Sequence, residues 1–249
     1  MSGVNEIIIY IKNGVMQIAI NRPEKKNALT MQMYDEIRAA IDVASNSDDI
    51  RIVLTHGNEQ AFTAGNDLTD FENRNFSGLS PGAKLLNTLH LFDKPIVASV
   101  SGIAVGIGAT MLLHCDLVYA SKTRFRMPFV NLGVCPEAAS SLLLPKLAGH
   151  RKASEILMLG DFFTVETAIE IGLVNQKIPQ SEVLDFATKK AEELARKPVR
   201  SLIVTKQLMK KNERDFLTQH MLEEFEHFSM LLNSPESKAI RAATLKAGK

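Results

Sequence analysis

The sequence predicts an α/β fold, because strand and helix patterns alternate through roughly the first 180 residues and only helix patterns follow. Strands are indicated by short β-branched runs such as residues 52–55 and 95–100, which are typical of buried strands. Helices are indicated by longer stretches in which apolar residues recur at helical spacing. With 249 residues, of which 45% are hydrophobic, the chain is long enough for one large domain with its own core.

The first predicted elements are a hairpin and a capped helix. Residues 6–11 and 15–20 are β-rich and flank Asn13 and Gly14, a pair typical of two-residue hairpin turns. After a polar loop, Thr30 is placed to cap a helix that runs to about residue 45. The pattern then predicts a strand over residues 52–55, a loop over 61–68, a helix over 81–92 and a strand over 95–100.

A glycine-rich turn follows the strand at residues 95–100. Gly102 closes the strand, Gly106 and Gly108 follow, and residues 109–113 have helical composition. A helix N-terminus reached in this way presents backbone N–H groups that have no intrahelical partner, and the glycines let a ligand approach closely. The stretch therefore predicts a site for an anion, or for an oxygen that becomes one during a reaction.

The rest of the chain is mainly helical by pattern. A strand over residues 117–120 is followed by a helix from Pro136 to about residue 147, since proline is favoured at the first helical position. The remaining predicted elements are helices over residues 151–159 and 165–171, a strand over 173–178, and helices over 181–196, 198–211, 215–232 and 235–246.

Composition argues against several classes of function. The net charge of +1 gives no support to binding of nucleic acid or of a membrane surface. No apolar run is long enough to cross a bilayer, and residues 1–6 do not resemble a secretion signal. Two cysteines, at 115 and 135, give no disulfide framework, so we expect a cytoplasmic protein. No group of histidines and cysteines has the spacing of a metal site.

The order and spacing of four segments resemble the enoyl-CoA hydratase/isomerase family, also called the crotonase family, over nearly the whole chain. These segments are residues 21–29, 62–68, 94–116 and 160–174. The resemblance implies a spiral of ββα units, an acyl-CoA thioester as substrate, and no cofactor beyond its CoA moiety. It also implies a core with the CoA and acyl site over residues 1–195, and a helical region over residues 196–249 that assembles a homotrimer or a hexamer.

Two backbone N–H groups hold the thioester oxygen in this family. The resemblance places one at Asn66 and the other at Ile107. Removing a proton next to a thioester builds negative charge on that oxygen, so two fixed donors stabilise the enolate. A glycine turn that serves only packing is the alternative. The other residues that the resemblance implies for substrate or CoA binding are Lys25, Lys26, Ala28, Ala64, Gly65, Asp67, Leu68, Gly106 and Phe129.

The acid and base residues differ from those of the hydratases in this family. Hydratases carry two glutamates, at the positions where this chain has Thr110 and Phe129, and neither of these side chains exchanges protons near pH 7. Glu137 instead resembles the single glutamate of the peroxisomal type of Δ3,Δ2-enoyl-CoA isomerases. An acidic residue in a first helical turn also commonly complements the helix dipole. Since that position lowers a carboxyl pKa, a base there needs apolar neighbours to desolvate it.

The sequence therefore favours an acyl-CoA isomerase that moves a double bond from position 3 to position 2 through a dienolate. Glu137 is the predicted base, and Asn66 and Ile107 are the predicted donors. A hydratase-type lyase, or other enolate chemistry on an acyl-CoA, is the alternative within the family. A non-catalytic acyl-CoA-binding protein is the alternative from another class.

Several further side chains have two interpretations. Cys135 is expected to be packed rather than reactive, and His114 is expected to be either packed or on the surface. Residues 85–91, together with Phe162 and Phe163, either line an acyl tunnel or pack in the core, and packing is favoured. One basic group either contacts the CoA of a neighbouring subunit or forms a solvated helix face; its members are Lys206, Lys210, Lys211 and Arg214.

Overall fold

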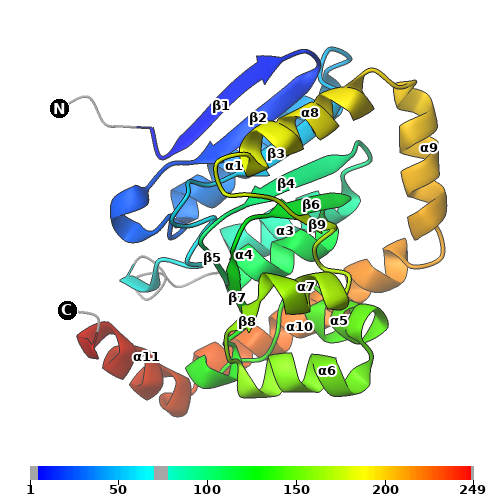
Figure 1. The fold of residues 1–249 in the computed structure, drawn as a ribbon. Helices are drawn as coiled ribbons and strands as arrows, with labels where there is room; N and C mark the ends of the chain where they lie inside the picture. Colours follow the sequence, from blue (N-terminus) through cyan, green and yellow to red (C-terminus); the bar gives the residue numbers. More distant parts are fainter. Residues whose placement is uncertain (1–4, 70–77, 248–249) are drawn as a thin grey trace.

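The computed structural model describes residues 5–69 and 78–247, and its main feature is a six-stranded sheet (Figure 1). The strands lie in the order β1, β2, β3, β4, β6, β9; β1 and β2 are antiparallel and all later neighbours are parallel. Their bounds are Ile7–Lys12 for β1, Val15–Ile20 for β2, Ile52–His56 for β3, Ile96–Val100 for β4, Leu117–Ala120 for β6 and Gln176–Lys177 for β9. Positive φ at Asn13 (54°) and Gly14 (76°) confirms the predicted hairpin turn.

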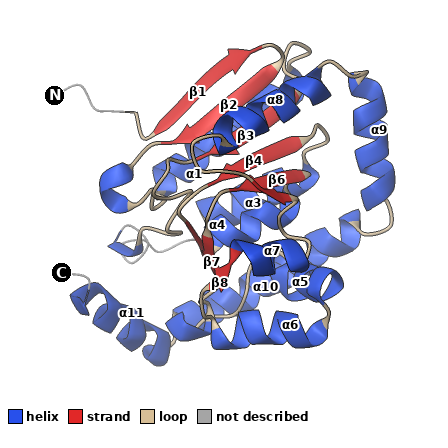
Figure 2. Cartoon of the chain, viewed as in Figure 1, coloured by secondary structure: helices blue, strands red, loops and turns tan. Residues whose placement is uncertain are grey.

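Helices cover both faces of this sheet (Figures 1 and 2). Alternate residues of β3 belong to two apolar clusters, since successive side chains of a strand point to opposite faces. Ile52 and Leu54 pack with α8 (Val183–Ala195) on one face. Val53 belongs to the larger core, where α1 (Met31–Asn46) and α3 (Pro81–Leu91) pack against each other on the opposite face.

A smaller sheet positions the glycine-rich turn. It consists of β5 (Ile103–Val105), β7 (Arg124–Arg126) and β8 (Phe163–Thr164), with β5 parallel to β7 and β7 antiparallel to β8. β5 leads directly into α4 (Ile107–Thr110) and its continuation η2 (Met111–His114). The predicted order of strand, glycine turn and short helix is confirmed, with one additional short strand inside it.

The remaining helices lie between the later strands and after them in the chain. Helix α9 runs down the right side of Figure 1 to α10, which packs against α3, and α11 extends at the lower left. Their bounds are α5 (Ser140–Ala148), α6 (His150–Ser154), α7 (Val165–Glu170), α9 (Val199–Lys210), α10 (Arg214–Leu232) and α11 (Pro235–Ala247), with single turns at η1 (Pro23–Lys25), η3 (Val130–Leu132) and η4 (Glu155–Leu159). In the described part of the chain, no helix combines the length and the hydrophobicity needed to cross a bilayer.

The start of one helix was predicted wrongly. The helix expected to begin at Pro136 begins at Ser140, because Ala138 and Ala139 adopt the left-handed conformation, with φ of 65° and 54°. Residue 137 therefore lies in a loop and not in a first helical turn. The other predicted cap is confirmed, since the Thr30 side chain accepts the N–H of Met33 at the start of α1.

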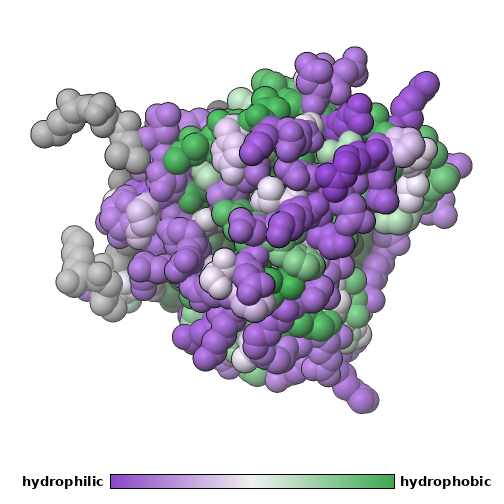
Figure 3. Space-filling view, turned by 45° about the horizontal axis from the view of Figure 1, so that its top comes forward, coloured by the Kyte–Doolittle hydropathy of each residue, from purple (hydrophilic) through white to green (hydrophobic). Residues whose placement is uncertain are grey.

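The surface is mostly hydrophilic on the face drawn in Figure 3, with patches of apolar side chains between the polar ones. Lys206 of α9 does not belong to this solvated surface, which corrects one of the two interpretations considered for the basic group. Its side chain is 5% exposed, and its Nζ lies 2.7 Å from Oδ2 of Asp116. The lysine is therefore part of a buried ion pair that ties α9 to the start of β6.

Candidate active site

Two loops that are far apart in the chain meet beside β5. Thr63 and Ala104 form a parallel bridge, in which the Val105 N–H donates to the Thr63 carbonyl oxygen over 3.0 Å. Leu29 forms a second parallel bridge with Asn66. The loop that follows β3 is thus held next to the turn that follows β5 by backbone hydrogen bonds, which depend little on side-chain identity.

Glycine is required at two positions of this arrangement. A Cβ atom at Gly65, whose φ is +91°, would lie 2.7 Å from the carbonyl oxygen of Val105. A Cβ atom at Gly108 would overlap Cγ2 of Thr63. The close approach of the two loops therefore depends on the absence of a side chain at both positions.

The geometry leaves the backbone N–H groups of Asn66 and Ile107 without an acceptor. Leu29 forms its hydrogen bonds with Gly65 and Asp67, so the Asn66 N–H between them faces away from Leu29. Ile107 is the first residue of α4, where an N–H has no intrahelical acceptor. Among the residues that the structure describes, neither N–H donates a hydrogen bond, and both residues line the same pocket. The structure thus brings the two predicted donors to one cavity.

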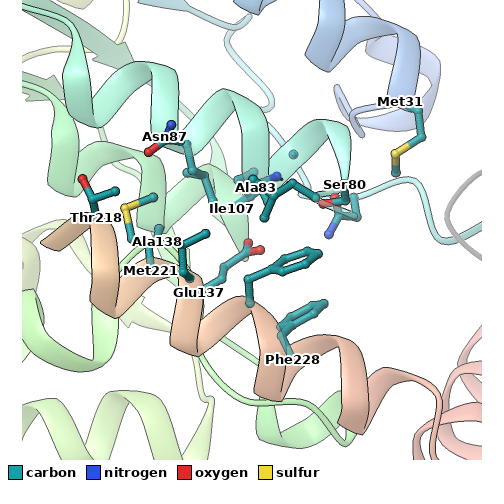
Figure 4. Close-up of a pocket in the computed structure, with 16 residues that line it drawn as sticks. Met31, Ser80, Ala83, Asn87, Ile107, Glu137, Ala138, Thr218, Met221 and Phe228 are labelled. Carbon is teal, nitrogen blue, oxygen red and sulfur yellow. Dashed lines mark hydrogen bonds between the residues drawn. The ribbon is translucent and has the colours of Figure 1, made fainter. Parts of the chain in front are cut away.

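This pocket is mainly apolar and lies between α3 and α10 (Figure 4). It contains about 850 Å³ of space not filled by protein atoms, part of which is open to solvent. Apolar walls with a few polar groups are typical of small-molecule sites. Of the segment expected either to line an acyl tunnel or to pack, Leu86 and Asn87 line the pocket and Leu85 is buried in the core. Phe162 instead contacts the Arg124 guanidinium, 4.0 Å from its ring centre.

Glu137 is the one titratable side chain among the described residues that line the pocket. Its carboxylate points into the cavity, as Figure 4 shows, and its Oε1 atom is shielded from solvent and has no hydrogen-bond partner. Burial, and then the negative charge of Glu224, raise the pKa of this carboxyl to about 8. The expected lowering by a helix dipole does not apply, because α5 begins only at Ser140.

The side chain of Asn66 is held by Tyr34 of α1, which sequence analysis missed. The Tyr34 hydroxyl donates to Oδ1 of Asn66 over 2.5 Å. Tyr34 is fully buried, and burial together with the charge of Glu137 holds the pKa of its hydroxyl well above the ordinary value, so it stays a donor. In the sequence, Tyr34 is marked only by its position beside the apolar face of the predicted helix. Such a position does not tell a packed side chain from a functional one.

The remaining predicted binding residues are not among those that line the pocket in the described part of the chain. The Ala64 N–H donates to the Lys26 carbonyl oxygen over 3.0 Å, so their two loops adjoin. Asp67 Oδ2 lies 2.7 Å from the Arg22 guanidinium, which occupies that carboxylate. Contact of the predicted set with substrate or CoA stays a prediction; the residues concerned are Lys25, Lys26, Ala28, Ala64, Gly65, Asp67, Leu68, Gly106 and Phe129.

Thr110 and Phe129, which stand where the resemblance implies glutamates in hydratases, provide no acidic side chain. Thr110 is fully buried, and its hydroxyl donates to the Gly106 carbonyl oxygen over 3.3 Å. Phe129 is buried in the main core. His114 is packed, since it is 2% exposed, and burial lowers its pKa to about 3. Cys135 is partly buried, its thiol donates to the Glu224 carbonyl oxygen over 3.6 Å, and burial raises its pKa to about 11.

One wall of the pocket comes from a helix that the sequence analysis assigned to oligomerisation. Helix α10 supplies lining residues at helical spacing, and they are Thr218, Met221, Leu222, Phe225 and Phe228. Such spacing predicts one covered face, but it does not tell a cavity wall from a subunit interface. The pocket therefore draws on residues from both sides of the predicted boundary after residue 195.

The whole chain is similar to proteins of one family. A family model described as Enoyl-CoA hydratase/isomerase matches residues 10–246. Enoyl-CoA delta isomerase 2 from Rattus norvegicus is 38% identical over 220 residues, covering 85% of this chain and 56% of that protein. Enoyl-CoA delta isomerase 2 from Homo sapiens is 36% identical over 225 residues, covering 87% of this chain and 57% of that protein. The chain thus spans little more than half the length of these two relatives.

Structural similarity agrees with this sequence similarity. The structure of Pseudomonas aeruginosa OdaA superposes with a TM-score of 0.94 at 39% identity, and the match covers 97% of this chain and 99% of that one. The crotonase-type α/β fold that the resemblance implied is confirmed. The chain, in which two unpaired backbone N–H groups and the Glu137 carboxyl line one pocket, therefore belongs to the enoyl-CoA hydratase/isomerase family.

Proposed function

We propose that this protein moves the double bond of an enoyl-CoA from position 3 to position 2, with Glu137 as its single base. One observation carries the proposal: a shielded, unpartnered carboxyl shares an apolar pocket with the unpaired N–H groups of Asn66 and Ile107. The names of the two relatives, both enoyl-CoA delta isomerases, support the same reaction.

In the proposed reaction, the thioester oxygen accepts hydrogen bonds from the Asn66 and Ile107 N–H groups. The Glu137 carboxylate takes a proton from C2, and the electron pair of that C–H bond delocalises into a dienolate whose negative charge collects on the thioester oxygen. Removing a single donor of this kind costs about 2.7–4 kcal/mol in one hydrolase, so two of them stabilise the charge substantially. The Glu137 carboxylic acid then returns the proton to C4, which leaves the double bond between C2 and C3.

The raised pKa of Glu137 suits this sequence of steps. A group that first accepts and then donates the same proton works best when its pKa lies near the working pH. The apolar wall of α10 limits the water that would compete for that proton. One carboxyl is enough, because C2 and C4 of the dienolate can lie on the same face toward Glu137.

Hydration would require a second acid or base, and the described residues that line the pocket include no second titratable side chain. Neither Thr110 nor Phe129 lines the pocket in the described part of the chain. Glu224 is the second carboxylate close enough to affect Glu137, but it is 7% exposed and accepts hydrogen bonds from Ala139 and Ser141. Its oxygens are therefore occupied, which leaves Glu137 to act alone.

The test is to incubate 3-hexenoyl-CoA and crotonyl-CoA separately with the wild type and with Glu137→Gln. The wild type should convert 3-hexenoyl-CoA to a conjugated product, and the variant should lose at least about a hundredfold, as expected for a positioned base. Water addition to crotonyl-CoA at a comparable rate would instead favour a hydratase-type lyase. Binding without turnover of either thioester would favour a non-catalytic acyl-CoA-binding protein.

We also propose a homotrimer or a pair of trimers, in the cytoplasm, with no cofactor beyond the CoA moiety of the substrate. Exposed apolar side chains on neighbouring helices support a subunit interface there; they are Val204, Leu208 and Met209 of α9 and Phe216 of α10. Light scattering in solution should give the mass of a trimer or a hexamer, and the mass of a monomer would contradict the proposal.

A further inference from the structure

Glu224 is a buried carboxylate on α10 that the proposed proton transfer does not use. It accepts three hydrogen bonds from Ala139 and Ser141, which lie where the loop that carries Glu137 joins the start of α5. The Ala139 N–H donates over 2.6 Å, the Ser141 N–H over 3.1 Å and the Ser141 hydroxyl over 2.5 Å. Hydrogen bonds to a carboxylate are stronger than those between neutral groups, so Glu224 is a firm anchor for this loop.

The loop needs such an anchor because its backbone is unfavourable. Ala138 and Ala139 both have positive φ, a conformation that a non-glycine residue keeps only when its surroundings impose it. Helix α5 has no side-chain cap of its own at Ala139. The Glu224 carboxylate takes the place of that cap, since it accepts N–H groups at the start of the helix.

Other groups fix the same loop from the opposite side. His114, at the end of η2, lies with its Nε2 2.9 Å from the Ala138 carbonyl oxygen and therefore donates to it. The Ser140 hydroxyl donates to the Glu137 carbonyl oxygen over 2.6 Å. Because η2 continues α4, His114 connects the helix that begins with Ile107 to the loop that carries Glu137. The donors and the base thus belong to one hydrogen-bonded unit, which Glu224 completes.

The titratable groups around Glu224 come from two elements. His220, on α10 itself, lies with its Nε2 3.6 Å from Glu224 Oε1 and 2.8 Å from the Ser141 hydroxyl oxygen. Cys135 and Glu137 face it from the loop. Cys135 keeps its proton at working pH, because its pKa is raised to about 11, so Glu137 is the group whose ionisation places a second negative charge beside Glu224 in that range.

We propose that Glu224 is a positioning residue for the isomerisation: it holds the loop so that the Glu137 carboxyl faces C2 and C4, and it keeps a negative charge near that carboxyl. The inference rests on the proposed function of Glu137. It assigns to the C-terminal helical region a part in the reaction in addition to subunit assembly.

The test compares Glu224→Gln with Glu223→Gln, which removes an exposed carboxylate from the neighbouring position of α10. Glutamine keeps the shape of Glu224, but its NH2 group cannot accept the loop N–H groups and its charge is lost. We expect kcat on 3-hexenoyl-CoA to fall at least about tenfold while KM changes less than about threefold. The rising limb of kcat/KM should move at least about half a pH unit lower, because Glu137 then ionises more easily. Glu223→Gln should change neither quantity.

If Glu224 had only a structural role, its replacement would lower the folded fraction but would not shift the rising limb of the profile of kcat/KM against pH. The proposal is overturned by a folded Glu224→Gln protein whose kcat stays within about twofold of the wild type and whose pH limb does not move. If Glu224→Gln does not fold, Ser141→Ala removes one of the three hydrogen bonds and leaves the charge. It should lower kcat at least about threefold at unchanged KM, and no change in kcat would equally overturn the proposal.

A readout that needs no turnover separates this inference from the proposed function. The difference in Tm between the wild type and Glu137→Gln, followed against pH, reports the titration of Glu137. The same difference measured in the Glu224→Gln background should show that titration at lower pH. If the wild type is inactive but the Glu137 titration moves to lower pH in the Glu224→Gln background, only the proposed function is contradicted. An active wild type with neither the shift nor a loss of kcat in Glu224→Gln would contradict this inference alone.

Discussion

The Tyr34 hydroxyl donates a hydrogen bond to the side-chain oxygen of Asn66 over 2.5 Å, and this bond ties α1 to the loop that presents one of the two N–H donors. Tyr34 is fully buried, so its hydroxyl is left without a partner if the bond is lost. The position of the Asn66 backbone therefore depends on a side chain that lies outside every motif of the family resemblance.

Replacement of Tyr34 by phenylalanine should weaken both folding and turnover. The variant leaves Oδ1 of Asn66 without its donor, which should cost about 1–3 kcal/mol in the free energy of unfolding. A displaced Asn66 N–H should lower kcat on 3-hexenoyl-CoA about tenfold. Urea denaturation and initial rates measure the two effects. Tyr10→Phe, which removes a hydroxyl bonded to Gln17 on exposed β1, is the matched control and should leave kcat unchanged.

Turnover should increase with pH up to about 8. Glu137 acts as a base only when it is ionised, and its raised pKa of about 8 leaves it mostly protonated at neutral pH. Below that value kcat/KM, which reports the free enzyme, should fall about tenfold for each pH unit, and above it the profile should level off. A profile that is flat from about pH 6 to about pH 9 would mean that Glu137 is not the base.

The stability of the protein should fall as pH rises, because of the same group. The folded pKa of Glu137, about 8, lies above its ordinary value of 4.5, so the folded state keeps a proton that the unfolded chain releases. Stability from this group is therefore complete below the ordinary pKa and is lost as pH rises through the folded pKa. Glu137→Gln carries no such proton, so its Tm relative to the wild type should increase between about pH 5 and about pH 9. A constant difference would contradict the burial of this carboxyl.

Addition of a methyl group at Gly65 should disrupt the paired loops. Alanine there would place Cβ 2.7 Å from the Val105 carbonyl oxygen, at a φ of +91°. Because the Gly65 carbonyl oxygen accepts the Leu29 N–H in the bridge that holds Asn66, we expect kcat/KM to fall about a hundredfold, with a lower Tm. Gly149→Ala is the control, since Gly149 has a φ of +75° but open space around it. Equal effects of the two substitutions would show that backbone strain alone is responsible.

Loss of the buried lysine on α9 should affect folding and leave the chemistry intact. Lys206 lies 2.7 Å from Asp116, whose side chain is 17% exposed, so Lys206→Met leaves a mostly buried charge unpaired. Removing one partner of such a pair costs about 3–5 kcal/mol. The double variant with Asp116→Asn should recover part of this loss, and kcat of the folded protein should match the wild type in both. A fall in kcat would show instead that α9 contributes to the site.

Local patterns were enough for the hairpin, the capped start of α1 and the glycine-rich turn, because the residues that determine each of them are neighbours in the chain. They were not enough for Ala138 and Ala139. Alanine is the best helix former, so the sequence predicts a helix through both positions. The structure places them in the left-handed region, where Glu224 and His114 hold them from other parts of the chain. Lys206 was misjudged for the same reason, because its exposure depends on Asp116, which is remote in sequence.

The late position of α10 in the sequence has a consequence for protein synthesis. Asn66, Ile107 and Glu137 all leave the ribosome before the helix that walls their cavity, and before Glu224 can fix the loop. A nascent chain that ends before α10 therefore contains the two N–H donors and the base of the proposed reaction, but it lacks one wall of the pocket. We therefore expect isomerase activity to appear only after α10 has been translated, so that chains truncated before this helix are inactive on CoA thioesters.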